Sequence, residues 1–207
     1  MDKEKIVQDA YNKIGKRYQE SGGNRDISEL KEIINLLPPK ARILDAGCGT
    51  GIPDTKYLHD SGFDVIGVDF SDGMLEIARE NLPNVTFIKQ NITELDFPDD
   101  SFDGLISFSV IIHIPREKHK PMFQQFHKLL KPDGIILVSM AWSEWEEIGE
   151  FCGEKMFWSH FKPETSLQII RDSGFSIIKD WFVTTPDYYN KDSESEKHYY
   201  ILAKNSK

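Results

Sequence analysis

Three glycines in five positions stand where an apolar segment ends and a helical pattern begins. They are Gly47, Gly49 and Gly51 of the segment ILDAGCGTG, residues 43–51. Glycine has no Cβ atom, so such a loop can turn sharply and bring its backbone close to a ligand. A tight turn needs one glycine, and three together predict a binding loop.

The spacing of these glycines separates two classes of nucleotide ligand. A dinucleotide-binding loop has the pattern G-x-G-x-x-G and directs a helix N-terminus at a pyrophosphate. Counted from Gly47 and Gly49, its third glycine would be residue 52, which is an isoleucine. Asp45 also precedes the loop, and a carboxylate there suits a ligand with an ammonium or sulfonium group. The loop therefore favours S-adenosylmethionine over NAD.

A second carboxylate, Asp69, ends the next apolar segment, twenty residues after Gly49. From that position a carboxylate can accept hydrogen bonds from both ribose hydroxyls. NAD and S-adenosylmethionine both contain this ribose, so Asp69 supports a nucleoside ligand without separating the two. The alternative interpretation of Asp45 and Asp69 is a helix cap or a solvated acid.

Two histidines are the candidate bases. His113 follows the fourth predicted strand, and His160 lies in an aromatic-rich stretch after the fifth. The alternatives are a hydrogen-bonded structural histidine for His113 and a surface histidine for His160. Cys48 and Cys152 share neither disulfide-framework nor metal-ligand spacing, so no metal site is expected.

The stretch 142–161 is dense in aromatic side chains and follows the fifth predicted strand. Loops at the carboxyl ends of parallel strands line the site in this type of sheet, so we expect an apolar substrate pocket or a lid. Packing within the lid is the alternative for any single ring. The pocket candidates, with one tyrosine from the first helix, are Tyr11, Trp142, Trp145, Phe157 and Trp158.

The elements that must position these groups alternate in type. Apolar segments at 41–46, 64–69, 85–90, 102–108 and 134–140 predict strands, and amphipathic segments at 53–61, 72–81 and 117–130 predict helices. Such alternation implies a parallel sheet with helices on both faces. A helix at 164–173 and two strands at 175–185 and 197–204, joined by a polar loop, predict an antiparallel end. The predicted fold class is α/β: a Rossmann-like, doubly wound, mostly parallel seven-stranded sheet with an antiparallel terminal strand.

Length and composition narrow the remaining possibilities. The 207 residues predict one domain, 1–207, with an N-terminal helical cap at about 1–37 and an aromatic lid at about 142–161. The 25 Lys and Arg against 34 Asp and Glu give a net charge of −9, which argues against nucleic acid as a partner. With no signal-like segment at the start and no stretch approaching the roughly 20 apolar residues of a membrane span, we expect a cytoplasmic monomer or homodimer.

With those residues in hand, the chain closely resembles the class I S-adenosylmethionine-dependent methyltransferases. Within them it resembles the small-molecule group related to the ubiquinone and menaquinone biosynthesis methyltransferases. The segments that carry the resemblance are ILDAGCGTG (43–51), VIGVDFSDGMLEIAREN (65–81), FPDDSFDGLISFSVIIHI (97–114) and LLKPDGIILVS (129–139).

The resemblance implies a role for each matching position. Asp69 would hold the ribose, Asp45 would lie near the methionine ammonium, and Tyr18 would contact the methionine carboxylate. Asn91 replaces the usual aspartate, and its amide oxygen would accept from the adenine amino group. The other implied cofactor contacts are Gly47, Cys48, Gly49 and Gly51 at the methionine portion, Phe70, Ser71 and Met74 around the ribose and adenine, the Ile92 backbone amide at an adenine nitrogen, and the Phe108 carbonyl at the ammonium.

The predicted function is S-adenosylmethionine-dependent methyl transfer, by in-line displacement, to a small-molecule acceptor with an apolar or aromatic part. S-adenosylhomocysteine would be the product. The acceptor atom is left open among oxygen, nitrogen, sulfur and carbon, because fold does not decide between them. The alternatives are an S-adenosylmethionine-binding module without catalysis and an NAD-dependent dehydrogenase.

Overall fold

The computed structural model describes residues 2–22, 27–185 and 196–207. Its main sheet has the strand order β3-β2-β1-β4-β5-β9-β8, and β6 pairs only with β7. The strands are β1 (Arg42–Ala46), β2 (Asp64–Asp69), β3 (Thr86–Lys89), β4 (Phe102–Ser107), β5 (Leu130–Met140), β6 (Trp145–Phe151), β7 (Glu154–His160), β8 (Phe175–Thr185) and β9 (Glu196–Asn205). The helices are α1 (Lys3–Gly22), α2 (Leu30–Ile34), α3 (Asp54–Asp60), α4 (Asp72–Asn81), the 3-10 turn η1 (Ile111–His113), α5 (Arg116–Leu129) and α6 (Pro163–Asp172).

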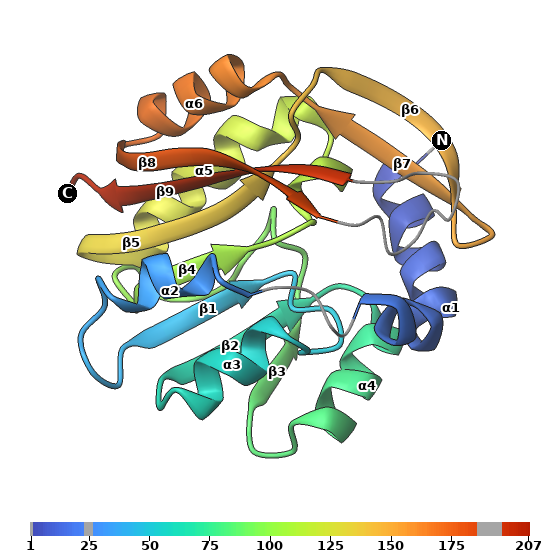
Figure 1. The fold of residues 1–207 in the computed structure, drawn as a ribbon, viewed down its shortest axis with the longest axis horizontal. Coiled ribbons are helices and arrows are strands. Elements are labelled where there is room, and N and C mark those ends of the chain that lie inside the picture. Colours follow the sequence, from blue (N-terminus) through green and yellow to red (C-terminus); the bar gives the residue numbers. More distant parts are fainter. Residues whose placement is uncertain (1, 23–26, 186–195) are drawn as a thin grey trace.

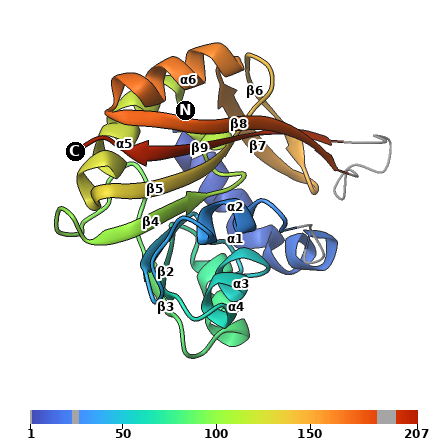
Figure 2. The same cartoon turned by 60° about the vertical axis from the view of Figure 1, so that its left-hand side comes forward.

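The pairing of the strands confirms the predicted fold class. Strands β1 to β5 pair in parallel, and β9 runs antiparallel to both β5 and β8. Helices cover both faces of the sheet (Figures 1 and 2). The joining loop that the sequence predicts lies at 186–195, outside the described residues.

Apolar residues on alternating sides of the strands build the two halves of the core. Leu44 of β1 packs in the cluster that contains Phe123 and Phe126 of α5, whereas its neighbour Ile43 packs in the cluster with Leu30 of α2 and Leu58 of α3. Successive side chains of a strand point to opposite faces. The strands are therefore apolar on both sides, as a doubly covered parallel sheet requires.

Several elements differ in bounds or in type from those predicted. Within the predicted helical cap at about 1–37, the second helix, α2, ends at Ile34. Strand β5 begins at Leu130, before the predicted 134, and its register against β4 shifts between Phe102 and Gly104. Most of the aromatic stretch 142–161 forms an antiparallel hairpin, β6–β7.

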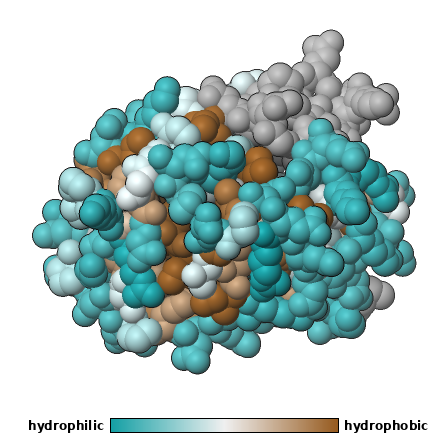
Figure 3. Space-filling view, turned by 90° about the horizontal axis from the view of Figure 1, so that it is seen from below, coloured by the Kyte–Doolittle hydropathy of each residue, from teal (hydrophilic) through white to brown (hydrophobic). Residues whose placement is uncertain are grey.

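One face of the molecule is seen in space-filling view (Figure 3). On the face seen from below, where α3 and β3 lie, polar residues surround a central apolar area (Figure 3). Within the described part of the chain, no helix combines the length and the apolar character that spanning a bilayer would require.

Candidate functional site

A cavity lies at the carboxyl ends of β1, β2, β3 and β4, and α1 forms one wall of it. This is the edge of a doubly wound sheet at which ligands bind. Its lining residues are Glu4, Val7, Tyr11 and Tyr18 of α1, Gly47 and Gly49 after β1, Asp69, Phe70 and Met74 around the start of α4, Gln90, Asn91 and Ile92 after β3, and Phe108, Ser109, Val110, His113 and Ile114 after β4.

The glycine loop follows β1 with positive φ angles at Gly47 (+90°), Gly49 (+53°) and Gly51 (+75°). Only glycine adopts such angles freely. A Cβ atom on Gly47 would lie 2.2 Å from Val110 Cγ2, whereas one on Gly49 would meet no atom within 4 Å. The loop therefore packs tightly at Gly47 and leaves an open place beside Gly49, where a ligand can approach the backbone.

Asp69 ties this loop to the start of α4. Its Oδ2 accepts from the Gly49 N–H at 3.0 Å, and its Oδ1 accepts from the Ser71 N–H at 2.9 Å. Burial raises the pKa of the Asp69 carboxyl, while these backbone N–H groups act in the opposite direction. A carboxylate offers about four acceptor sites, so Asp69 retains acceptor capacity toward the cavity. That is the chemistry that a ribose diol requires.

Four of the predicted cofactor contacts are not among the residues that line the cavity. Asp45 is 3% exposed and its Oδ2 accepts from the Thr55 hydroxyl at 2.5 Å. Ser71 Oγ accepts from the Met74 N–H at 3.2 Å and so caps α4. Cys48 packs in an apolar cluster with Phe87, and burial raises the pKa of its thiol well above the usual range. The fourth is Gly51, which lies beside Leu82 and Phe87.

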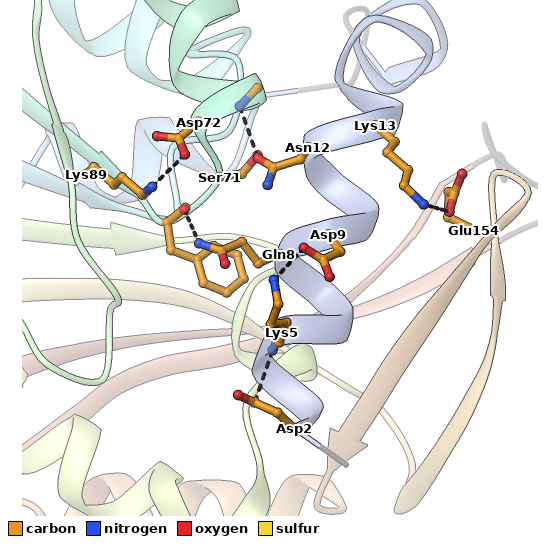
Figure 4. A network of polar contacts seen from close by, with 12 residues as sticks. Asp2, Lys5, Gln8, Asp9, Asn12, Lys13, Ser71, Asp72, Lys89 and Glu154 are labelled. Atoms are coloured by element: carbon orange, nitrogen blue, oxygen red, sulfur yellow. Dashed lines mark hydrogen bonds and ion pairs between the residues drawn. The ribbon is translucent and has the colours of Figure 1, made fainter.

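Helix α1 is hydrogen-bonded to the start of α4 and the residues just before it (Figure 4). Gln8 Nε2 donates to the Phe70 carbonyl at 2.7 Å. Asn12 Oδ1 accepts from the Ser71 hydroxyl at 2.8 Å and from the Gly73 N–H at 3.1 Å. The sequence carried no signal for these two residues, because their partners are about sixty positions away in the chain.

The opposite side of α1 contacts the β6–β7 hairpin. Lys13 Nζ lies 2.8 Å from Glu154 Oε2, and Arg17 Nη1 donates to the Cys152 carbonyl at 2.6 Å. Met156 and Phe157 of the hairpin pack against α1 in one apolar cluster. Helix α1 therefore connects the hairpin to the wall of the cavity.

Tyr11 and His113 form a pair in the lining. The Tyr11 hydroxyl lies 3.0 Å from His113 Nε2, and His113 Nδ1 lies 2.7 Å from the Phe157 carbonyl. A carbonyl only accepts, so Nδ1 carries the proton and Nε2 accepts from the tyrosine. Burial lowers the pKa of His113 to about 4, which leaves a neutral imidazole at pH 7.

At the β3 end of the cavity, Glu4 and Asn91 lie side by side. Asn91 Nδ2 donates to Glu4 Oε2 at 3.3 Å, and Lys118 Nζ lies 2.7 Å from Glu4 Oε1. Asn91 Oδ1 accepts from both the N–H and the hydroxyl of Thr93, each at 3.0 Å. Glu4 is a lining residue that the sequence did not single out.

The aromatic residues predicted for a substrate pocket are placed differently. Trp142 is 54% exposed and Trp145 is 47% exposed. Trp145 stacks on Trp158 with 6.0 Å between ring centroids, and Phe157 is buried against α1. The lining of the cavity includes none of these four aromatic residues of the stretch 142–161. It does include Tyr11, the fifth candidate.

The second candidate base also stands apart from the cavity. His160 is 5% exposed, and its Nδ1 lies 2.5 Å from the Ser143 carbonyl. Burial lowers its pKa. The predicted site residues that do line the cavity together are Tyr11, Tyr18, Gly47, Gly49, Asp69, Phe70, Met74, Asn91, Ile92, Phe108 and His113.

Comparisons with known proteins agree with this arrangement. A methyltransferase-domain family model matches residues 43–134. Phosphoethanolamine N-methyltransferase 1 of Zea mays is 32% identical over 80% of this chain. The chain covers 34% of that protein and 26% of an Arabidopsis thaliana phosphoethanolamine N-methyltransferase, so it spans about a third or less of these relatives.

Solved structures share the fold. An S-adenosylmethionine-dependent methyltransferase from Methanosarcina mazei superposes with a TM-score of 0.75 at 19% identity, covering 87% of this chain and 99% of that one. Magnesium protoporphyrin IX methyltransferase of Synechocystis, solved with bound S-adenosylmethionine, has a TM-score of 0.71 at 23% identity and covers 100% and 98%. Residues 43–134 therefore match a methyltransferase-domain family, and the chain shares the fold of solved S-adenosylmethionine-dependent methyltransferases.

Proposed function

We propose that this protein transfers the methyl group of S-adenosylmethionine to a small-molecule acceptor by in-line displacement and releases S-adenosylhomocysteine. The observation that carries the proposal is Asp69, which lines the cavity, is bonded to the glycine loop and retains acceptor capacity. The proposal takes residues 1–207 as one methyltransferase domain. Its cytoplasmic location, its oligomeric state and the exclusion of nucleic acid stay predictions.

The cofactor side of the site follows from the lining. Asp69 would accept from the ribose hydroxyls, and the open place at Gly49 would admit the methionine portion. Tyr18 lines the cavity on α1, where its hydroxyl would reach the methionine carboxylate. When bound, the cofactor supplies a methyl group on a positively charged sulfur that is a good leaving group. Asp45 and Ser71 would act indirectly, because they fix the ends of β1 and α4.

The methyl acceptor would bind beside the Tyr11–His113 pair. An acceptor with an O–H or N–H group gives up a proton when it is methylated. The Tyr11 hydroxyl donates to His113 Nε2, so its oxygen can accept a hydrogen bond from that O–H or N–H group and hold the acceptor in line with the methyl group. Because the pKa of His113 is about 4, the imidazole is too weak a base to keep the proton at pH 7, and the proton leaves to water. The pair also fixes the orientation of the tyrosine hydroxyl in the cavity.

The charge of the residues that line the cavity restricts the chemical class of the methyl acceptor. Among the described residues of the lining there is no Lys or Arg, whereas Glu4 and Asp69 are acidic and most of the others are apolar. Phosphate recognition ordinarily uses cationic side chains. We therefore infer a neutral or cationic acceptor with an apolar part. Phosphoethanolamine, named for the plant relatives, fits this lining poorly.

Two measurements test the function. Calorimetry with S-adenosylhomocysteine and NAD should show binding of the first only. The protein should also transfer radiolabelled methyl groups from S-adenosylmethionine to a compound in a small-molecule extract, and Tyr11→Phe should slow this transfer. Tight binding without any labelled product would favour a non-catalytic binding module. Binding of NAD alone would instead indicate a dehydrogenase.

A further inference from the structure

At the β3 end of the cavity, where adenine would bind under the proposed function, the hydrogen-bonding groups are unexpected. The exocyclic amino group of adenine is a donor and needs an acceptor. Asn91 stands at the end of β3, where that acceptor is expected, but both lone pairs of its amide oxygen are taken by Thr93. Its nitrogen is itself a donor. Asn91 therefore offers no acceptor to a bound adenine.

The neighbouring glutamine has one of the two lone pairs of its amide oxygen engaged, and it carries no charge. Gln90 Oε1 accepts from the Asp96 N–H at 2.9 Å. Asp69 lies at the end of β2, one strand away, where it is held by Gly49 and Ser71. The acidic side chain at the β3 end of the lining is thus Glu4, which comes from α1 rather than from the sheet.

Glu4 is held in place from two sides. Lys118 of α5 binds Oε1 at 2.7 Å, and Asn91 donates to Oε2 at 3.3 Å. The glutamate side chain is 23% exposed. Each carboxylate oxygen accepts more than one hydrogen bond, so Oε2 retains capacity on the cavity side. The Asn91 contact places that oxygen beside the residue at which an adenine edge would lie.

Building on the proposed function, we propose that Glu4 accepts the hydrogen bond of the adenine amino group. The acceptor would then come from the N-terminal helix, and Asn91 would position it. Nucleoside binding would thereby also fasten α1, because the same helix contacts Phe70 and Ser71 beside Asp69.

The test compares two ligands that differ only at this amino group. The purine riboside analogue of S-adenosylhomocysteine carries a hydrogen atom in place of the amino group and keeps N1 as an acceptor. By calorimetry, the protein should bind S-adenosylhomocysteine at least about 10-fold more tightly than this analogue, as expected for a hydrogen bond to a charged group. In Glu4→Ala this preference should fall to about 2-fold or less. Glu20→Ala, on the exposed side of the same helix, should keep the wild-type ratio.

A second variant separates recognition from helix packing. In Glu4→Ala with Asn91→Asp, the new carboxylate has two more acceptor sites than the amide oxygen, so the preference for adenine should return. A preference that is unchanged in Glu4→Ala, equal weakening of both ligands, or no recovery in the double variant would each overturn the role of Glu4. Failure of the wild-type protein to bind either ligand would overturn the proposed function instead. Melting temperatures check that each variant is folded.

Discussion

The Tyr11 hydroxyl and His113 Nε2 lie 3.0 Å apart although 102 positions separate them in the chain. The same imidazole reaches the Phe157 carbonyl of β7 through Nδ1 at 2.7 Å. One neutral side chain thus joins α1, η1 and the β6–β7 hairpin at the wall of the cavity. A change of its protonation state acts on all three elements at once.

This arrangement predicts a pH-dependent stability. An unfolded histidine titrates near pH 6.5, whereas burial lowers the pKa of folded His113 to about 4. Between these values the unfolded chain binds the extra proton, so His113 stabilises the fold fully above pH 6.5 and this contribution is lost as the pH falls toward 4. The loss amounts to about 3 kcal/mol. Urea unfolding at pH 7 and at pH 4.5 measures it.

The matched variant for that measurement is His113→Asn, which keeps a donor for the Phe157 carbonyl but does not titrate. Its free energy of unfolding should change less between the two pH values, by about 2 to 3 kcal/mol. His59→Gln on α3 should follow the wild type. Parallel curves for His113→Asn and wild type would contradict the lowered pKa.

Asp69→Asn should bind S-adenosylhomocysteine at least about 10-fold more weakly, because it loses a charged acceptor for the ribose hydroxyls. The asparagine has the same shape but one acceptor oxygen, so one of the N–H groups of Gly49 and Ser71 also loses its partner. We expect a lower melting temperature together with the weaker binding. Calorimetry on the folded variant, with Asp60→Asn on the exposed α3 as control, measures the first effect. Unchanged affinity would disprove the ribose contact.

The glycine loop predicts two different outcomes for the same substitution. Gly49→Ala adds a methyl group that meets no protein atom, so the protein should fold with a small loss of stability from the positive φ and should bind the cofactor poorly. Gly47→Ala places its Cβ 2.2 Å from Val110 Cγ2, so it should mainly destabilise the fold. Thermal melts and calorimetry on both variants distinguish the two. Equal melting temperatures would argue against this packing.

Asn12→Ala should weaken the attachment of α1 to the start of α4, since Asn12 accepts hydrogen bonds from both Ser71 and Gly73. We expect faster amide hydrogen exchange in residues 3–22 and several-fold weaker binding of S-adenosylhomocysteine. Lys13→Ala breaks an exposed ion pair on the other side of the helix, and such pairs contribute little. It should leave both measurements nearly unchanged. Exchange that is the same in both variants would show that Asn12 does not hold the helix.

Local pattern was sufficient for much of the fold. The strand at 64–69 and the helix at 72–81 were predicted with the boundaries that the structure shows. Their signals are a short run of apolar residues and an amphipathic repeat, and both depend on neighbours in sequence. The aromatic stretch was harder, because rings that stack within a hairpin and rings that line a pocket have the same composition.

The sequence by itself determined the doubly wound sheet and the positions of Gly49 and Asp69 at its carboxyl edge, because strand periodicity, glycine spacing and the end of a strand are local properties. Only the tertiary structure decided which groups share the cavity. The packing of α1 and α3 on the sheet decides three contacts: Tyr11 with His113, Glu4 with Asn91, and the hydrogen bond from Thr55 to Asp45. Each acceptor atom takes a limited number of hydrogen bonds, so the acceptors that remain for a ligand are known only when every partner is in place.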